Sequence, residues 1–239
     1  MLNFLRALDE RLPSCDGKHM SEHINLTSNI DGHTLTALRA NPAAEPIGGV
    51  VILQEIFGLT DHIADMCALF AGAGYAALAP SLFDRIEPGF HAEHDPDGIK
   101  KGAAAVAATP WPQVISDIQA AIDALPQPVY VAGFCYGGTA TWMAAAKCRG
   151  IKSGASFYGR LIVNLLDNTP QVPVMLHYGA HDTAIPPSNY ESVQRTAPDA
   201  PLYLYDAGHG FCRAGSSDFH APSRDLALAR TLDWFARWR

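Results

Sequence analysis

The residues best suited to covalent chemistry lie in the segment Gly-Phe-Cys-Tyr-Gly-Gly at positions 133–138. An apolar run precedes it and a run typical of a helix follows, so Cys135 falls on a strand-to-helix turn. In a G-x-S-x-G elbow the nucleophile occupies this strained turn, and small neighbours leave it room. Gly133 and Gly137 supply that room here, and the start of the following helix favours a thiolate. The pattern predicts that Cys135 is a nucleophile; the alternative is a buried structural cysteine beside a packing turn.

A cysteine nucleophile needs a base and an acid, and both follow it in the chain. Asp182 comes just after an apolar run at 174–178, and His209 comes just after another at 201–205. His209 would take the thiol proton and later activate water, while Asp182 would orient the imidazole and stabilise its cation. His177 and His181 compete for the role of base, but His177 lies within a strand and His181 precedes the acid. If they have no catalytic role, Asp182 and His209 would be ordinary solvated turn residues.

Glu55 is the fourth candidate, at the end of the apolar run 49–54. A carboxylate there would disfavour a nearby thiolate through like-charge repulsion, or would accept the Cys135 proton directly. The alternative is a solvated carboxylate at a strand end. The backbone N–H groups of Tyr136 and Ile56 would form the oxyanion hole, one after the nucleophile and one from the first strand–helix loop.

The elements that position these residues alternate between strands and helices. Two alternating stretches, 23–27 and 33–39, flank a turn and predict a β-hairpin. Further strands are expected at 49–54, 75–79, 129–132, 154–158, 174–178 and 201–205. Helices are expected around 63–70, 114–125, 139–148, 188–196 and 228–238.

This alternation predicts the α/β class: a mostly parallel sheet with helices on both faces, entered through an antiparallel hairpin. A parallel sheet also explains why the candidates cluster, since strand carboxyl ends meet at one edge. We expect a single domain over residues 20–239, and residues 1–19 form a possible N-terminal extension.

One insertion, residues 83–102, contains His91, Glu93, His94, Asp95 and Asp97. Histidines and carboxylates this close suggest a metal loop, but the ligand spacing is not that of a strong metal site. Prolines and glycines in the segment favour a solvated surface loop over a cleft instead.

Composition excludes several function classes. The 239 residues include 17 Lys plus Arg against 24 Asp plus Glu, a net charge of −7, which argues against nucleic-acid or anionic-membrane surfaces. No apolar run is long enough to span a bilayer. The sequence has neither a dinucleotide fingerprint nor a P-loop, so no cofactor, nucleotide, flavin or metal is expected.

The five cysteines are an odd, scattered number without a CxxC pair, which predicts a reducing, cytoplasmic location. Cys67 lies on a helix core stripe, Cys148 near a helix end, and Cys15 in the possible extension. Cys212, between His209 and the following arginine, is expected at the edge of the site, where it would interfere with thiol labelling.

With these motifs in hand, the sequence resembles the dienelactone hydrolase family (carboxymethylenebutenolidases), which has the α/β-hydrolase fold. The resemblance extends from Val50 to Trp234 and rests on Gln-Glu-Ile-Phe-Gly at 54–58, the elbow at 133–138, the turn at 179–182, and the segment at 208–217. It implies a triad of Cys135, Asp182 and His209. It also implies that Glu55 contacts the resting thiol until a substrate carboxylate displaces it. The reaction implied is hydrolysis of dienelactone to maleylacetate through an acyl-enzyme.

The same resemblance implies that two arginines hold the substrate carboxylate and that Phe57 lines the pocket. Arg213 matches one arginine, but the other position offers only Lys100 or Lys101, and Arg85 stands too early. Because lysine lacks the bidentate fork of arginine, dienelactone is not the only substrate to consider.

The partner expected is thus a small ester or lactone bearing a carboxylate, with no nucleic acid, membrane or obligate protein partner. The alternatives are a hydrolase of another activated ester or thioester, and a non-catalytic thiol-based binding or redox protein.

Overall fold

A computed structural model describes residues 21–239. The predicted extension at 1–19, with Cys15, lies outside the described residues. Eight strands form one sheet: β1 (Glu22–Thr27), β2 (Thr34–Ala40), β3 (Gly49–Leu53), β4 (Ala76–Pro80), β5 (Val129–Phe134), β6 (Ile151–Phe157), β7 (Val174–Gly179) and β8 (Leu202–Tyr205). Every strand predicted from the sequence is present, with β6 beginning three residues earlier than expected.

The strands lie in the order β1-β2-β4-β3-β5-β6-β7-β8. β1 pairs antiparallel with β2, and β2 pairs antiparallel with β4, whereas all pairs from β4 to β8 are parallel. The predicted mostly parallel sheet entered through a hairpin is therefore confirmed. The parallel arrangement places the carboxyl ends of β3, β5, β7 and β8 along one edge, where all four candidate residues follow.

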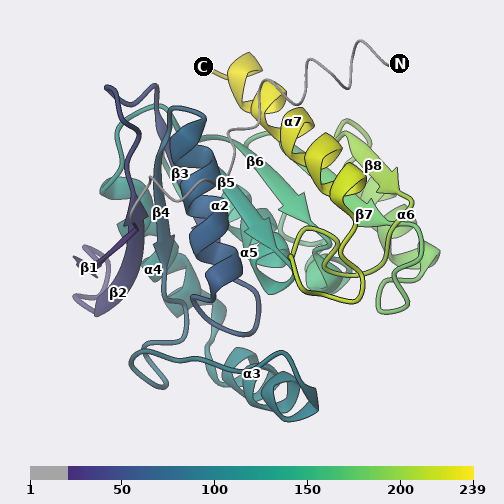
Figure 1. Ribbon diagram of the computed structural model, residues 1–239, viewed down its shortest axis with the longest axis horizontal. Helices are drawn as coiled ribbons and strands as arrows, with labels where there is room; N and C mark the ends of the chain where they lie inside the picture. The colour runs from purple at the N-terminus through teal and green to yellow at the C-terminus, as the bar shows by residue number, and fades with distance from the viewer. Residues whose placement is uncertain (1–20) are drawn as a thin grey trace.

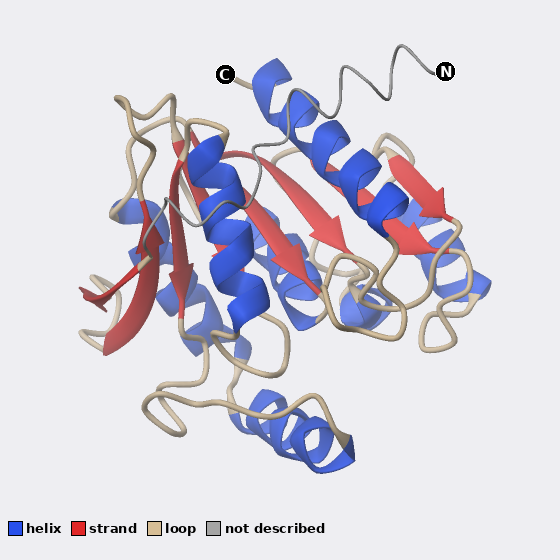
Figure 2. Ribbon diagram, in the orientation of Figure 1, coloured by secondary structure: helices blue, strands red, loops and turns tan. Residues whose placement is uncertain are grey.

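Helices cover both faces of the sheet (Figures 1 and 2). They are α2 (Asp61–Gly72), α3 (Pro96–Ala108), α4 (Trp111–Asp123), α5 (Tyr136–Lys147), the 3-10 helix η1 (Arg160–Asn164), α6 (Pro187–Thr196) and α7 (Ala221–Arg237). In the view of Figure 1, α2 and α7 lie in front of the sheet, and α4 and α5 lie behind it. Among these helices of residues 21–239, none is long and apolar enough to cross a membrane.

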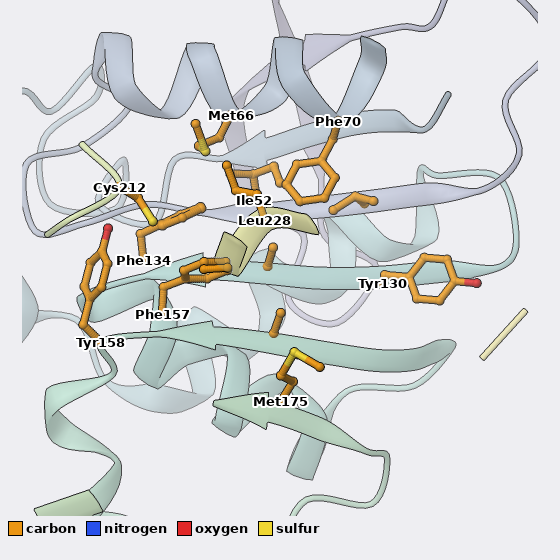
Figure 3. Close-up of a cluster of buried hydrophobic side chains, with 14 of the residues drawn as sticks. Ile52, Met66, Phe70, Tyr130, Phe134, Phe157, Tyr158, Met175, Cys212 and Leu228 are labelled. Carbon is orange, nitrogen blue, oxygen red and sulfur yellow. The ribbon is translucent and has the colours of Figure 1, made fainter. Parts of the chain in front are cut away.

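The core consists of two apolar clusters separated by the sheet. In β3, Val50 and Ile52 belong to one cluster, and Val51 and Leu53 belong to the other. Such alternation follows from the two-residue period of a strand, and the unbroken apolar run was the signal that both faces are buried. Figure 3 shows the first cluster, in which the rings of Phe134 and Phe157 stack with centroids 4.7 Å apart at the carboxyl ends of β5 and β6. The turn that follows β5 is thus supported by buried aromatic side chains.

The prediction of a surface loop over residues 83–102 is wrong in its second half, which begins α3. Asp95 caps this helix by accepting a hydrogen bond from the Gly98 N–H at 2.7 Å, and Pro96 occupies its first turn. Aspartate and proline are common both at helix N-termini and in loops, so the sequence pattern does not distinguish the two. In Figure 1, α3 lies beyond the strand carboxyl ends, outside the two helical layers. Residues 21–239 contain no group of three or more His, Cys, Asp or Glu arranged to hold a metal ion.

Candidate active site

Cys135 lies between β5 and α5 with φ 53° and ψ −110°, a strained conformation for a residue with a side chain. The glycines around it permit this turn. A Cβ on Gly133 would collide with the Gly137 carbonyl, and a Cβ on Gly137 would collide with the Leu53 carbonyl of β3. The sharp turn predicted from the glycine spacing is therefore present, with the thiol partly exposed at its tip.

His209 connects the thiol to Asp182. Its Nε2 lies 3.2 Å from Cys135 Sγ, and its Nδ1 lies 2.7 Å from Asp182 Oδ2. Because a carboxylate only accepts, Nδ1 carries the proton, which leaves Nε2 facing the sulfur. The other Asp182 oxygen, Oδ1, accepts the Ala184 N–H at 2.8 Å, so this carboxylate is held on both sides. The structure brings together the three residues predicted from separate strand ends.

The electrostatics of this trio favour the protonated form of His209. Burial by itself would lower the pKa of His209, but the adjacent Cys135 sulfur and the Asp182 carboxylate outweigh it and raise that pKa to about 10. The imidazolium is thus stabilised by its two neighbours. Tyr158 supports the ring, with its own ring centroid 5.1 Å from that of His209.

Tyr158 was not among the predicted site residues. It follows β6 with φ 40°, and its N–H donates to the His177 carbonyl at 2.7 Å, which fixes the strained backbone. A non-glycine residue in the left-handed region carries no sequence signal of its own.

Glu55 is buried beside the trio, with 3% of its side chain exposed. Its Oε2 lies 3.4 Å from Arg213 Nε and 4.0 Å from His94 Nε2. Burial raises the pKa of Glu55, while the positive charges of Arg213 and His209 oppose the rise. In the described structure the thiol hydrogen bond is to His209 rather than to Glu55, unlike the resting contact implied by the family resemblance.

The two residues predicted to form an oxyanion hole follow β5 and β3, and their role stays a prediction. Tyr136 is the first residue of α5, so its N–H has no acceptor within the helix. Ile56 follows Glu55 beyond β3 and lies under α3, where a Cβ on Gly102 would collide with the Ile56 carbonyl. Phe57 is buried, with its ring 4.2 Å from that of His94 and 5.7 Å from the Arg213 guanidinium. It therefore lies next to His94 and Arg213, and its predicted role in lining the substrate pocket stays a prediction.

The cations proposed for the second anchor position are engaged elsewhere. Lys100 pairs with Asp97 at 2.9 Å. Lys101 pairs with Glu87 at 3.1 Å and also donates to the His91 carbonyl. Arg85 pairs with two carboxylates remote from the site, those of Asp31 and Asp117. The expectation that Lys100 or Lys101 replaces the second arginine is therefore not supported by their contacts.

His94, from the same insertion, lies near Glu55 together with Arg213; the sequence suggested His94 only as a metal ligand. A histidine close to carboxylates in an insertion does not indicate which side of the site it will line.

The competing histidines are accounted for by other contacts. His177 is fully buried between the Tyr205 hydroxyl and the Thr231 hydroxyl, and burial lowers its pKa to about 3. His181 is exposed and pairs with Asp206. Within the described chain, His209 is thus the histidine whose ring contacts the Cys135 thiol.

The remaining described thiols are free; Cys67 and Cys212 are buried, and Cys148 is partly buried like Cys135. Cys67 is a core residue, as predicted, and burial raises its pKa to about 12; burial does the same for Cys148 at the end of α5. Cys212 is only 1% exposed, and Figure 3 shows it beside Phe134 and Tyr158. The expectation that Cys212 would interfere with labelling is therefore wrong, because it points into the core.

A pocket of about 590 Å³ opens beside Glu55. It is lined by Leu59, Thr60, Asp61, His62, His91, Glu93, His94, Arg213, Ala214 and Gly215. His94 and Arg213 connect this pocket to Glu55, because both lie near its carboxylate. The lining also includes the exposed carboxylates of Asp61 and Glu93.

Comparison with known proteins agrees with this geometry. The sequence model of the dienelactone hydrolase family matches residues 35–238. The chain belongs to the dienelactone hydrolase family. A carboxymethylenebutenolidase of Pseudomonas knackmussii is 31% identical over 230 residues, covering 91% of this chain and 97% of that protein. A carboxymethylenebutenolidase of Pseudomonas putida matches with the same identity and coverage.

Solved structures place this dienelactone hydrolase family member in the α/β-hydrolase fold. A Klebsiella pneumoniae protein assigned to the dienelactone hydrolases matches with a TM-score of 0.78 and 28% identity, over 92% of this chain and 100% of that one. A dienelactone hydrolase-like promiscuous phosphotriesterase from metagenomic libraries has a TM-score of 0.74 at 22% identity, over 93% and 99% of the two chains, and shares the fold. The chain is thus a hydrolase of the carboxylic ester and lactone class, which sets aside a non-catalytic thiol protein.

Proposed function

We propose that this enzyme hydrolyses a lactone or activated ester through a triad of Cys135, His209 and Asp182. The observation that carries the proposal is the Cys135 Sγ to His209 Nε2 distance of 3.2 Å, with His209 held by Asp182 at 2.7 Å. These are the contacts that nucleophilic catalysis needs before a substrate arrives. The raised pKa of His209 means that the proton required by the leaving group is already on the imidazole.

In the first half-reaction the Cys135 sulfur attacks the carbonyl carbon and forms a C–S bond. The π electron pair moves to the carbonyl oxygen, where the N–H groups of Tyr136 and Ile56 stabilise the oxyanion. When the oxyanion collapses, the C–O bond to the leaving oxygen breaks, and that oxygen takes the His209 proton. For a lactone the leaving hydroxyl stays attached to the acyl group.

In the second half-reaction water gives a proton to neutral His209 as its oxygen attacks the thioester carbon. Collapse of this second oxyanion breaks the C–S bond, and the sulfur leaves with the electron pair as a thiolate beside protonated His209. The acid product then releases its own proton. Asp182 remains ionised throughout and stabilises the imidazolium each time it forms.

Glu55 is proposed to control the thiol, and Arg213 to hold a substrate carboxylate. Arg213 approaches Glu55 at 3.4 Å, so a bound carboxylate would compete for the same guanidinium and release Glu55. Freed from Arg213, a buried Glu55 would take up a proton more readily and lose the negative charge that disfavours the Cys135 thiolate. Dienelactone, with maleylacetate as product, fits this scheme and is the substrate suggested by the names of the Pseudomonas relatives.

The proposal is tested by steady-state kinetics of Cys135→Ala on cis- and trans-dienelactone and on 4-nitrophenyl acetate. Cys148→Ala serves as a matched control, since it removes another partly buried thiol. We expect Cys135→Ala to lose turnover and to show no acyl adduct by mass spectrometry after rapid quenching. Wild-type turnover in this variant would refute the triad.

A second candidate is a hydrolase of another activated ester or thioester. It is favoured by the engagement of Lys100 and Lys101 with other carboxylates, which leaves the arginine pair of the family incomplete. A kcat/KM for neutral aryl esters or thioesters well above that for dienelactone would establish this alternative.

A cytoplasmic location is also proposed, because a thiol nucleophile works only while reduced and the four described cysteines are free. Recovery of the enzyme in a secreted fraction of its source cells would contradict this.

A further inference from the structure

At the pocket beside Glu55, two buried polar atoms have no hydrogen-bond partner in the protein. They are Thr60 Oγ1 and His62 Nε2, both from residues that line the pocket. Arg213 Nε and Glu55 Oε2, by contrast, lie 3.4 Å apart and form an ion pair with each other. Buried polar groups are nearly always hydrogen-bonded, so the two remaining atoms at one pocket indicate that a polar ligand completes them.

His62 provides a neutral polar group on the inner wall. It lies in the first turn of α2, is 6% exposed, and packs edge-on against Phe134 with ring centroids 5.1 Å apart. Phe134 directly precedes Cys135, so this wall is close to the nucleophile. Burial and the charge of Arg213 lower the pKa of His62 to about 3, so its imidazole stays neutral.

His94 provides a second imidazole, and its position is fixed by contacts between two loops. Gly58 forms an isolated antiparallel bridge with His91, and the Ala92 N–H donates to the Phe57 carbonyl at 3.0 Å. The His94 ring then packs on Phe57, with Nε2 4.0 Å from Glu55 Oε2. This is the same oxygen that Arg213 approaches. His94 is 32% exposed, so it can exchange protons with solvent.

We propose that this pocket binds a substrate carboxylate between Arg213 and protonated His94, with Thr60 and His62 completing its hydrogen bonds, so that His94 is a pH-dependent specificity residue. The inference rests on the proposed function and deepens it. One arginine and one imidazolium supply two positive charges, and the two neutral groups satisfy the remaining acceptor sites of a carboxylate. Asp61 and Glu93, which also line the pocket, are exposed to solvent, whereas the Arg213 side chain is only 18% exposed.

The charges around His94 determine how binding depends on pH. The charged and titratable groups that face it are Arg213 from the loop before α7, Glu55 after β3, His62 from α2, and His91 and Glu93 from its own loop. Burial and Arg213 lower the pKa of His94, only partly offset by Glu93. In the absence of a further anion, His94 therefore favours the neutral imidazole at neutral pH.

A bound carboxylate adds negative charge and favours protonation of His94. Binding then takes up a proton, and affinity for anionic substrates falls as pH rises. Protonation of Glu55 at low pH would also raise the affinity for anionic substrates, so the test must separate the contributions of His94 and Glu55.

The test compares two esters of equal length that differ in charge: mono-4-nitrophenyl glutarate and its methyl-capped counterpart. The succinate and adipate homologues vary the distance between the ester carbonyl and the carboxylate. The measured quantity is the preference ratio, kcat/KM for the carboxylate ester over kcat/KM for the capped ester. It is followed from about pH 6 to about pH 8.5, across the range in which histidine titrates, at the isosbestic wavelength of nitrophenol.

We expect the wild-type ratio to fall as pH rises. His94→Gln should lower the ratio at pH 6 by about tenfold, the size of one charge-assisted hydrogen bond, and should reduce its pH dependence. His94→Arg should restore a high ratio that no longer falls with His94 titration; any slope it shares with His94→Gln belongs to Glu55. His23→Gln, on the exposed edge strand β1, is the matched histidine control.

The proposal is overturned if His94→Gln keeps the wild-type ratio and its wild-type pH dependence. That failure is distinct from failure of the triad, which is read from Cys135→Ala on the capped ester alone. Should His94→Gln fold poorly, the His94→Arg profile decides: a slope equal to that of the wild type refutes the role of His94.

Discussion

Replacing Asp182 by asparagine is expected to remove most of the activity by placing the His209 proton on the wrong nitrogen. Asp182 Oδ1 accepts the Ala184 N–H, and this position still demands an acceptor after the change. The asparagine oxygen must therefore take that place, which turns its NH₂ group toward His209 Nδ1. Nδ1 then has to accept, and the proton of the neutral ring moves to Nε2, where it faces the sulfur.

The size of the expected fall in kcat/KM follows from the removal of the Asp182 carboxylate. His209 loses the carboxylate that helps raise its pKa to about 10, and in its neutral form it can no longer take the thiol proton. We expect kcat/KM to fall by about 10²- to 10³-fold, which corresponds to about 3–4 kcal/mol in the barrier. The loss is smaller than for a serine nucleophile, because a thiol ionises more readily without help.

The assay is kcat/KM for 4-nitrophenyl acetate, with nitrogen NMR chemical shifts of the His209 ring reporting the tautomer. Asp206→Asn is the matched control, because Asp206 also pairs with a histidine but on the exposed surface. Thermal unfolding verifies that both variants are folded. Asp182→Asn activity within about fivefold of the wild type, or an unchanged tautomer, would refute the reasoning, since either outcome means that Ala184 does not orient the amide.

Three further outcomes are expected. The pKa of His209 is raised from 6.5 to about 10, so its ion pair stabilises the fold fully below pH 6.5, and this stabilisation is lost as the pH rises toward 10. The free energy of unfolding, measured with urea, should show this loss in the wild type and not in His209→Gln. Gly102→Ala should place a methyl group against the Ile56 carbonyl and lower kcat by about tenfold, part of what losing an oxyanion donor costs. Ala104→Ser, on the exposed face of α3, should leave kcat unchanged. Equal kcat values for the two variants would show that α3 does not brace the oxyanion hole. Lys101→Ala should leave the carboxylate preference ratio unchanged, and a marked fall would restore the anchor role that its Glu87 contact argues against.

The sequence was sufficient to predict the parts of the site that strand order alone brings together. Glu55, Cys135, Asp182 and His209 each follow a strand, and a parallel sheet necessarily gathers such residues at one edge. The glycines at 133 and 137 gave the local turn, because few other structures need small residues at that spacing. Side-chain direction was already fixed by the motif at these positions.

The second wall of the site could not be predicted in this way. His94 reaches Glu55 through a pairing between the loops at 56–58 and 90–92, and such non-local contacts leave no periodic signal. The helix beginning at Pro96 was hidden by prolines and glycines that also form loops. Lys100 and Lys101 had the right charge at the expected distance along the chain, yet the helix directs them toward nearby carboxylates.

The bridge between Gly58 and His91 has a consequence for how this enzyme can be altered. It joins the loop after β3, which carries Ile56 and its proposed oxyanion-hole N–H, to the segment that carries His94. The helix α3 packs against the same loop at Gly102. A change in the length of residues 83–95 would therefore shift reaction rate and substrate choice together. For exchange between homologous enzymes, the transferable module is the whole stretch from residue 83 to residue 108, grafted with its matching 55–58 loop.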